Sequence, residues 1–145
     1  MGRPKSPLEQ LLDAFDRLDA DACTALFATD GRLSWVDGHV AEGHTAVRAR
    51  LTEYFDDLTS MTHVVRDSWH LDQVWIAEID ASYVLEDRSL QGPVAKVMIL
   101  RMRSEGIGDL RVYAAVEPSF HAAEQRHQRE RDRGLVVGDW RLPPL

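Results

Sequence analysis

Histidines are the side chains of this sequence best suited to chemistry near neutral pH, and His63 stands out among them. It lies in the stretch 62–67, whose residue types alternate as in a strand. An imidazole has an unperturbed pKa of about 6.5, which suits a general acid or base. Alternation places Val65, Asp67 and Trp69 on the strand face of His63. Four residues span about 13 Å of strand, so Asp67 is too distant to pair with His63, and an orienting partner must come from another element.

Other kinds of reactive site lack their signatures. The six histidines do not have the spacing of zinc ligands, so we expect no metal. No G-x-S-x-G motif surrounds Ser34, Ser68 or Ser119, and Cys23 has no evident base. The segment 106–108 (Gly-Ile-Gly) is too short to cradle a phosphate and indicates a turn. Acid/base chemistry by His63 therefore remains, with a hydrogen-bonded structural histidine as the alternative.

Composition limits the class of protein and its partners. The 145 residues are enough for one domain, and 44% of them are hydrophobic, as in soluble globular proteins. The formal net charge of −7 argues against binding to nucleic acid or to anionic lipid. No apolar run approaches the roughly 18 residues of a membrane span, and we expect no secretory signal. A single cysteine fits a cytoplasmic setting, and the excess of arginine over lysine is typical of a GC-rich bacterial genome.

The first half of the chain has helical patterns that surround one short strand. Ser6, Pro7 and Glu9 form a capping box before a helix with an apolar stripe, and Asp19 and Asp21 can cap a short second helix. After a turn at 30–31, residues 32–37 alternate as a strand. This strand is expected to carry Trp35 and Asp37 on one face. Apolar residues at helical spacing then predict a third helix over residues 44–58.

From residue 61 onward the apolar period changes from 3.6 to 2. It predicts strands over residues 62–71, 74–85, 94–103 and 110–116, joined by short turns as in an antiparallel meander. Three helices followed by such strands indicate an α+β fold with a curved antiparallel sheet. We expect one domain over residues 7–120. A C-terminal extension, 121–145, then combines a helix with an apolar tail that a second subunit would cover.

A set of large side chains is suited to lining an apolar pocket for a flat ligand. Tyr113 would offer its hydroxyl as a donor there, although packing in the core explains the same residues. The set comprises Trp35, Tyr54, Trp69, Tyr83, Met98 and Tyr113.

Several segments together resemble the nuclear-transport-factor-2-like superfamily, and within it the SnoaL-like group of polyketide cyclases, dehydratases and isomerases. They are residues 25–31, Gly43 before the third helix, His63 on the next strand, and residues 109–113. The resemblance covers residues 8–120. It implies a cone in which the sheet wraps around a long helix and encloses an apolar pocket. It also implies homodimers and hydrophobic ring-bearing ligands, with no cofactor or metal.

The resemblance gives His63 the role of general acid or base, as in the dehydratases of this fold. We expect Asp37 to orient it, and Asp67 to help bind the substrate. At three other positions where related enzymes have a tyrosine or an acid, this sequence has an apolar residue. Leu11 and Trp35 stand where ketosteroid isomerases have their tyrosine and aspartate. Ala115 stands where cyclases and epoxide hydrolases of the fold often have an acid.

Two functional hypotheses follow. The first is a cofactor-independent cyclase, dehydratase or isomerase that acts on a hydrophobic ring-bearing molecule by acid/base catalysis. The second is a non-catalytic module of the same fold that binds a small molecule or forms a dimer. The apolar residues at positions 11, 35 and 115 favour the second hypothesis, and His63 with Asp67 favours the first.

Overall fold

The computed structural model describes residues 2–35 and 37–114. The predicted extension 121–145 and position 115 lie outside these residues. Within them the chain forms three helices and six strands. In chain order these are α1 (Pro7–Asp16), α2 (Ala20–Ala25), β1 (Phe27–Ser34), β2 (Val40–Glu42), α3 (His44–Asp56), β3 (Leu58–Leu71), β4 (Val74–Leu85), β5 (Leu90–Arg103) and β6 (Gly106–Ala114).

The first two helices begin at the residues that the sequence predicts. The hydroxyl of Ser6 accepts a hydrogen bond from the backbone N–H of Glu9 (3.1 Å), and Pro7 occupies the first helical position. The carboxylate of Asp19 accepts from the backbone N–H of Ala22 (2.9 Å). These caps satisfy N–H groups that have no partner within the helix.

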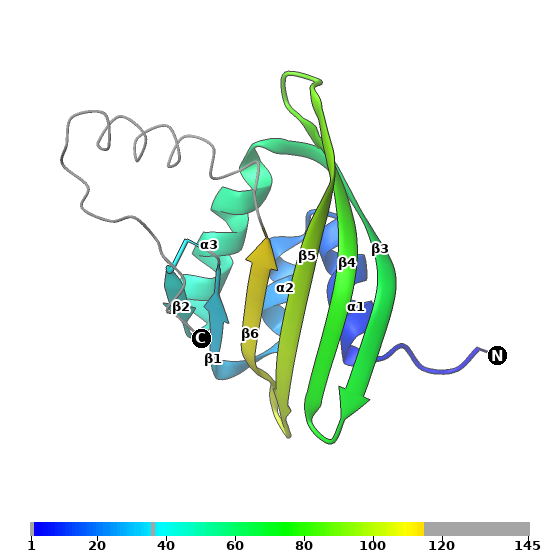
Figure 1. Cartoon of the computed structure of the whole chain (residues 1–145). Coiled ribbons are helices and arrows are strands. Elements are labelled where there is room, and N and C mark those ends of the chain that lie inside the picture. Colours follow the sequence, from blue (N-terminus) through cyan, green and yellow to red (C-terminus); the bar gives the residue numbers. More distant parts are fainter. Residues whose placement is uncertain (1, 36, 115–145) are drawn as a thin grey trace, which may run out of the picture.

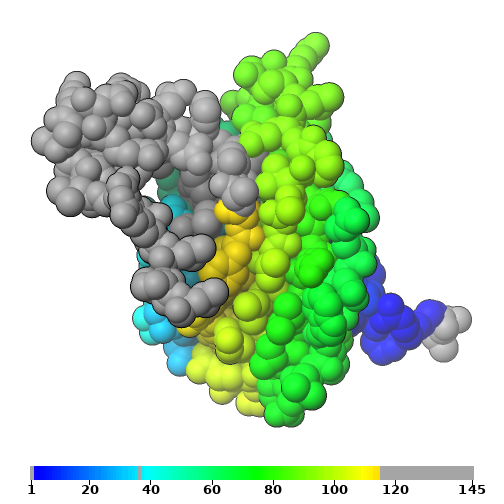
Figure 2. Space-filling view, in the orientation of Figure 1, coloured from blue at the N-terminus to red at the C-terminus, as the bar shows by residue number. Residues whose placement is uncertain are grey.

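All six strands form one sheet, in the order β2-β1-β6-β5-β4-β3. Strands β3 to β6 are a continuous antiparallel meander, as predicted, and β1 pairs in parallel with β6. The three helices lie on the same side of this curved sheet (Figure 1). The α+β class is confirmed. We call the side that faces the helices the inner face and the opposite side, towards the viewer in Figure 2, the outer face.

The first strand differs from its prediction. It runs through the expected turn at 30–31 and ends at Ser34, so Asp37 lies beyond it, and the short strand β2 follows. Gly31 lies inside β1, where a Cβ atom would come within 2.5 Å of the carbonyl oxygen of Ile107 on β6. The glycine therefore permits close backbone approach at the irregular β1–β6 pairing.

The core lies between the helices and the inner face. Helix α1 buries its predicted apolar stripe, and α3 buries Val47, Leu51, Tyr54 and Phe55. The inner face of β4 contributes Ala77, Ile79, Ala81 and Tyr83, all at most 1% exposed. Among the described residues, no helix is long and apolar enough to span a membrane.

Candidate functional site

His63 lies on the inner face of β3 with its side chain completely buried. Its Nδ1 is 2.7 Å from a carboxylate oxygen of Asp16, the last residue of α1. An ionised carboxylate only accepts hydrogen bonds, so Nδ1 carries a hydrogen and donates it. The ring of Phe15 lies edge-on to the imidazole, with 5.9 Å between the ring centroids. Nε2, the other ring nitrogen, is also buried. The hydrogen bond with Asp16 and the contact with Phe15 hold the imidazole in one orientation.

Asp16 takes the orienting position that the sequence analysis gave to Asp37, and that prediction was wrong. The carboxylate of Asp37 accepts from the backbone N–H of His39 (3.0 Å), contacts its ring nitrogen Nδ1 (2.9 Å), and accepts from Arg50 (2.5 Å). Burial alone would raise the pKa of Asp37. The hydrogen bonds from His39 and the charge of Arg50 outweigh burial and hold this pKa below its usual value. Asp37 is committed to a turn because β1 ends before it.

Asp67 and Trp69 do not share the face of His63, because β3 contains an extra residue. Its register with β4 shifts between Val65, which pairs with Ile79, and Asp67, which pairs with Glu78. Arg66 and Asp67 thus oppose a single residue, as in a β-bulge. Paired residues point to the same side of a sheet, so Asp67 joins Glu78 on the outer face. Trp69, which is 47% exposed, lies there too. The prediction that they line the pocket with His63 was wrong.

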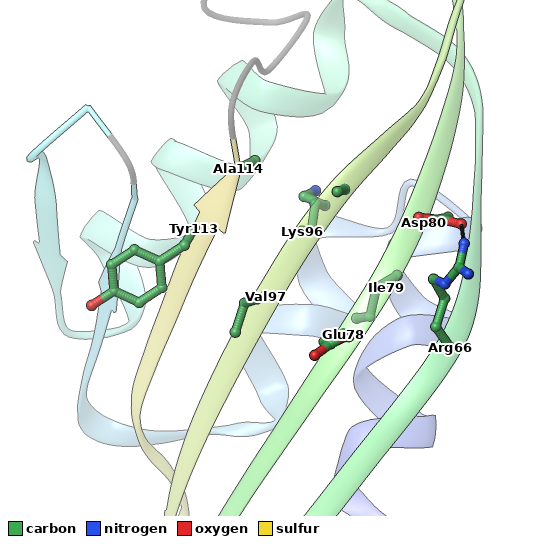
Figure 3. A pocket seen from close by; sticks show the side chains of 9 residues that line it. Arg66, Glu78, Ile79, Asp80, Lys96, Val97, Tyr113 and Ala114 are labelled. Carbon is green, nitrogen blue, oxygen red and sulfur yellow. Dashed lines mark hydrogen bonds and ion pairs between the residues drawn. The ribbon is translucent and has the colours of Figure 1, made fainter.

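The other predicted pocket residues divide between the two faces. Trp35, Tyr54 and Met98 are at most 4% exposed and belong to the core. The ring of Phe15 lies 6.4 Å from that of Tyr54 and 6.5 Å from that of Trp35, so the same phenylalanine connects them to His63. Tyr113 is 47% exposed and extends from the outer face of β6 (Figure 3). It therefore cannot offer its hydroxyl in the interior.

Lys96 is a buried functional group that the sequence analysis missed. It lies on β5 with 2% of its surface exposed. Its ammonium donates to the hydroxyl of Tyr54 (3.2 Å), and that hydroxyl donates to the hydroxyl of Tyr83 (3.3 Å). The ammonium also lies over both phenol rings, 5.6 Å and 5.4 Å from their centroids. We call Lys96, Tyr54 and Tyr83 the inner cluster.

The sequence did contain signals for these missed residues. Lys96 alternates with Val94, Met98 and Leu100, so a lysine occupies an inward position of an otherwise apolar face. Asp16 directly follows Phe15, at the edge of the apolar stripe of α1. Polar groups within or beside an apolar stripe are candidates for buried hydrogen bonds.

Residues 2–35 and 37–114 contain no candidate metal site and no reactive thiol. No group of three His, Cys, Asp or Glu side chains in these ranges could hold a metal ion. Cys23 is buried, and burial together with the neighbouring charge of Asp19 raises its pKa to about 12. A thiol in that environment stays protonated and unreactive.

A hollow of about 390 Å³ lies over the outer face of β3 to β6 (Figure 3). Arg66 and Asp80 form an ion pair at one side of it (2.8 Å). The hollow is open, and its lining includes Lys96 but not His63.

Comparison with known proteins assigns the chain to a family. The family model described as SnoaL-like domain matches residues 8–107. This chain belongs to the SnoaL-like domain family. A search of curated proteins gave no match.

Solved structures support the same fold for this SnoaL-like domain. A ketosteroid isomerase-like-fold protein from Catenulispora acidiphila, in complex with trimethylamine, is similar (TM-score 0.68, 15% identity, 77% of this chain and 86% of that one). An NTF2-like protein from Burkholderia pseudomallei is also similar (TM-score 0.66, 15% identity, 83% of this chain and 92% of that one). A protein from Jannaschia sp. CCS1, described as a SnoaL-like polyketide cyclase, also matches (TM-score 0.63, 14% identity, 79% of this chain and 92% of that one). At such identities the likeness shows the fold.

The SnoaL-like domain thus combines an oriented imidazole with buried hydrogen-bond donors in one apolar interior. A buried imidazole oriented by a carboxylate has the chemistry of a general acid or base, because the carboxylate stabilises the imidazolium form. The apolar surroundings strengthen each of these electrostatic interactions.

Proposed function

We propose that this SnoaL-like domain is a cofactor-independent enzyme that acts on a hydrophobic ring-bearing small molecule by general acid/base catalysis. The reaction is of the cyclase, dehydratase or isomerase class, and His63 transfers the proton. Asp16, rather than Asp37, orients the imidazole.

The observation that carries this proposal is the buried hydrogen bond between His63 and Asp16. Burial of an imidazole beside a carboxylate fixes which nitrogen carries the hydrogen and aims the other one. A histidine that is oriented by a neighbouring group in this way is typical of enzymes that use the imidazole as a base. The aromatic neighbours Phe15, Trp35 and Tyr54 support an apolar, ring-bearing ligand.

The test begins with ligands. A thermal-shift screen with steroid-like, polyketide-like and terpenoid compounds identifies binders, which are then assayed for turnover. In a His63→Gln variant, the amide can still donate to Asp16 but cannot act as an acid or base. We expect kcat to fall about 10²- to 10⁴-fold, the usual contribution of such a group, with the melting temperature within a few degrees.

His70→Gln is the matched control, because His70 is a histidine on the same strand. It stacks on Trp75 (3.7 Å between centroids) near the β3–β4 turn. It should retain full turnover. Undiminished turnover in His63→Gln would show that the imidazole does not transfer the proton.

The second candidate function is a non-catalytic small-molecule-binding module. It is favoured by Leu11 and Trp35, which are core residues at positions where related isomerases have their tyrosine and aspartate. Ligands that stabilise the protein and are never converted, across the whole screen, would decide for this module.

A further inference from the structure

A second hollow lies on the outer face of the sheet, at the point where β1 ends. Strand β1 stops at Ser34, which pairs with Arg111, and residues 112–114 of β6 extend beyond it (Figure 1). The space beside them is about 290 Å³, and its lining includes Arg32, Ser34, Val40, Arg111 and Tyr113. We call it the arginine hollow. Neither His63 nor a member of the inner cluster lines it.

Two arginines reach the arginine hollow from neighbouring strands. Arg111 lies directly beside Ser34, and Arg32 is two residues before Ser34 on the same face of β1. The spacing and rise of the strands place the Cα atoms of the two arginines roughly 8 Å apart, which is within reach of two long side chains. One oxyanion can therefore contact both guanidinium groups and the hydroxyl of Ser34 beside them.

Arg32 is available to a ligand. It is exposed, and no side chain among residues 2–35 and 37–114 forms an ion pair or hydrogen bond with its guanidinium. Glu42 on β2 and Asp109 on β6 lie opposite it in the register. The carboxylate of Asp109, however, accepts from Arg111 (3.1 Å) and from Arg101 (3.3 Å). An arginine is always charged at neutral pH, so Arg32 presents an unused cation to the hollow.

The local charges favour an anion with a single negative charge. Arg32, Arg101 and Arg111 lie together on this part of the outer face, and the carboxylates opposite them are those of Glu42 and Asp109. This excess of one positive charge contrasts with the net charge of −7 of the whole chain. A carboxylate would balance it, and the two oxygens of a carboxylate match the planar fork of a guanidinium.

The rest of the lining suits an aromatic ring. Val40 and Tyr113 are both about half exposed, and the ring of Tyr113 extends from β6 towards β1 (Figure 3). Hydrogen bonds with the hydroxyl of Tyr113 and with Asp109 raise the pKa of Arg111, so this guanidinium lies beside the phenol. A flat ring placed against Tyr113 would gain aromatic contact while its acid group meets the arginines.

We propose that the arginine hollow is a second binding site, which takes the carboxylate of an aromatic acid. Arg32 and Arg111 bind the carboxylate, and Tyr113 and Val40 contact the ring. Binding there makes and breaks no covalent bond. The site lies outside the proposed catalytic interior and does not depend on the proposed function.

The experiment compares two ligands that differ in charge. 2-Naphthoate and 2-naphthamide have the same fused rings and nearly the same shape, and only the first is an anion at neutral pH. Calorimetry or ligand-observed NMR with the full chain, at low ionic strength, gives both dissociation constants. We expect naphthoate to bind roughly tenfold more tightly than naphthamide, the effect of a charge-assisted hydrogen bond.

Single substitutions locate the carboxylate. Arg32→Gln and Arg111→Gln each remove one guanidinium and should lower the ratio of the two affinities several-fold, while naphthamide affinity stays similar. Both arginines are exposed, so these variants should fold as the wild type does. Arg66→Gln is the matched control, because Arg66 is an exposed arginine of the outer face that borders the other hollow. It should keep the wild-type ratio.

A further substitution locates the ring. Tyr113→Ala removes surface that both ligands contact, so it should weaken naphthoate and naphthamide by similar factors. Unchanged affinities for both ligands would place the ring elsewhere and overturn the inference.

Four other results would also overturn it: no binding of naphthoate up to its solubility, a wild-type ratio near one, an unchanged ratio in Arg32→Gln or Arg111→Gln, or an equal loss in Arg66→Gln. The last result would show that the net charge of the chain, rather than the hollow, sets the preference. None of them decides the role of His63, which rests on turnover in His63→Gln.

Discussion

The two faces of the sheet use polar side chains in opposite ways. On the inner face, His63 and Lys96 are buried: the imidazole of His63 is hydrogen-bonded to Asp16, and the ammonium of Lys96 donates to Tyr54. On the outer face, Arg66 pairs with Asp80, and Asp109 with Arg101 and Arg111, with the arginines about half exposed or more. Water can replace an outer partner but not an inner one. The polar groups whose position the fold determines most strongly are therefore those of the inner face.

The largest expected difference between the faces concerns two tyrosines. Tyr83 is 1% exposed on the inner face, and Tyr113 is 47% exposed on the outer face. Tyr83→Ala leaves a cavity in the core and should lower the free energy of unfolding by about 3–5 kcal/mol. Tyr113→Ala should lower it by less than about 1 kcal/mol. Urea denaturation measures both, and similar losses would show that the outer face is covered as tightly as the core.

A smaller difference is expected between two carboxylates. Asp16→Ala removes the acceptor of His63 and leaves a buried N–H without it, which should lower the free energy of unfolding by about 1–3 kcal/mol. Asp80→Ala removes the partner of Arg66, whose side chain is 65% exposed, and should have a much smaller effect. The same denaturation experiment compares them. A larger loss in Asp80→Ala than in Asp16→Ala would show that the polar pair of the outer face stabilises the fold more than that of the inner face.

The fold was predictable because it depends on patterns that repeat along the chain. The stripe of α1, the cap at Ser6 and the alternation in β4 each predict their element from local sequence. The family resemblance added the architecture, and the match over residues 8–107 confirms it.

The site was less predictable because single residues change it. One extra residue at Arg66 moves Asp67 and Trp69 to the other face, and alternation alone gives no sign of a bulge. The partner of His63 is 47 positions away in sequence, which no local pattern reveals. Lys96 was the exception, since its inward position could have been recognised from the alternation of β5.

The smallest expected effect concerns two aspartates that the protein shields from solvent to different extents. The side chain of Asp37 is 22% exposed beside Arg50, and that of Asp30 is 70% exposed beside Arg103. Both pKa values are lowered: in Asp37 hydrogen bonds and charge outweigh burial, and in Asp30 the hydrogen bond from Arg103 dominates. A lowered pKa means that each carboxylate stabilises the fold above its unfolded pKa of about 3.9, and that this stability is lost as the pH falls through the folded pKa.

Asp37→Asn and Asp30→Asn should each therefore flatten the decline in unfolding free energy between about pH 5 and pH 3. Salt separates the two, because exposed charges are screened over about 3 Å at 1 M ionic strength and shielded ones much less. In high salt Asp30→Asn should match the wild-type profile, while Asp37→Asn should still differ from it. If both variants matched the wild type, water would reach Asp37 as freely as Asp30. Shielding by the protein would then distinguish only the deeper groups, His63 and Lys96, from the outer ion pairs.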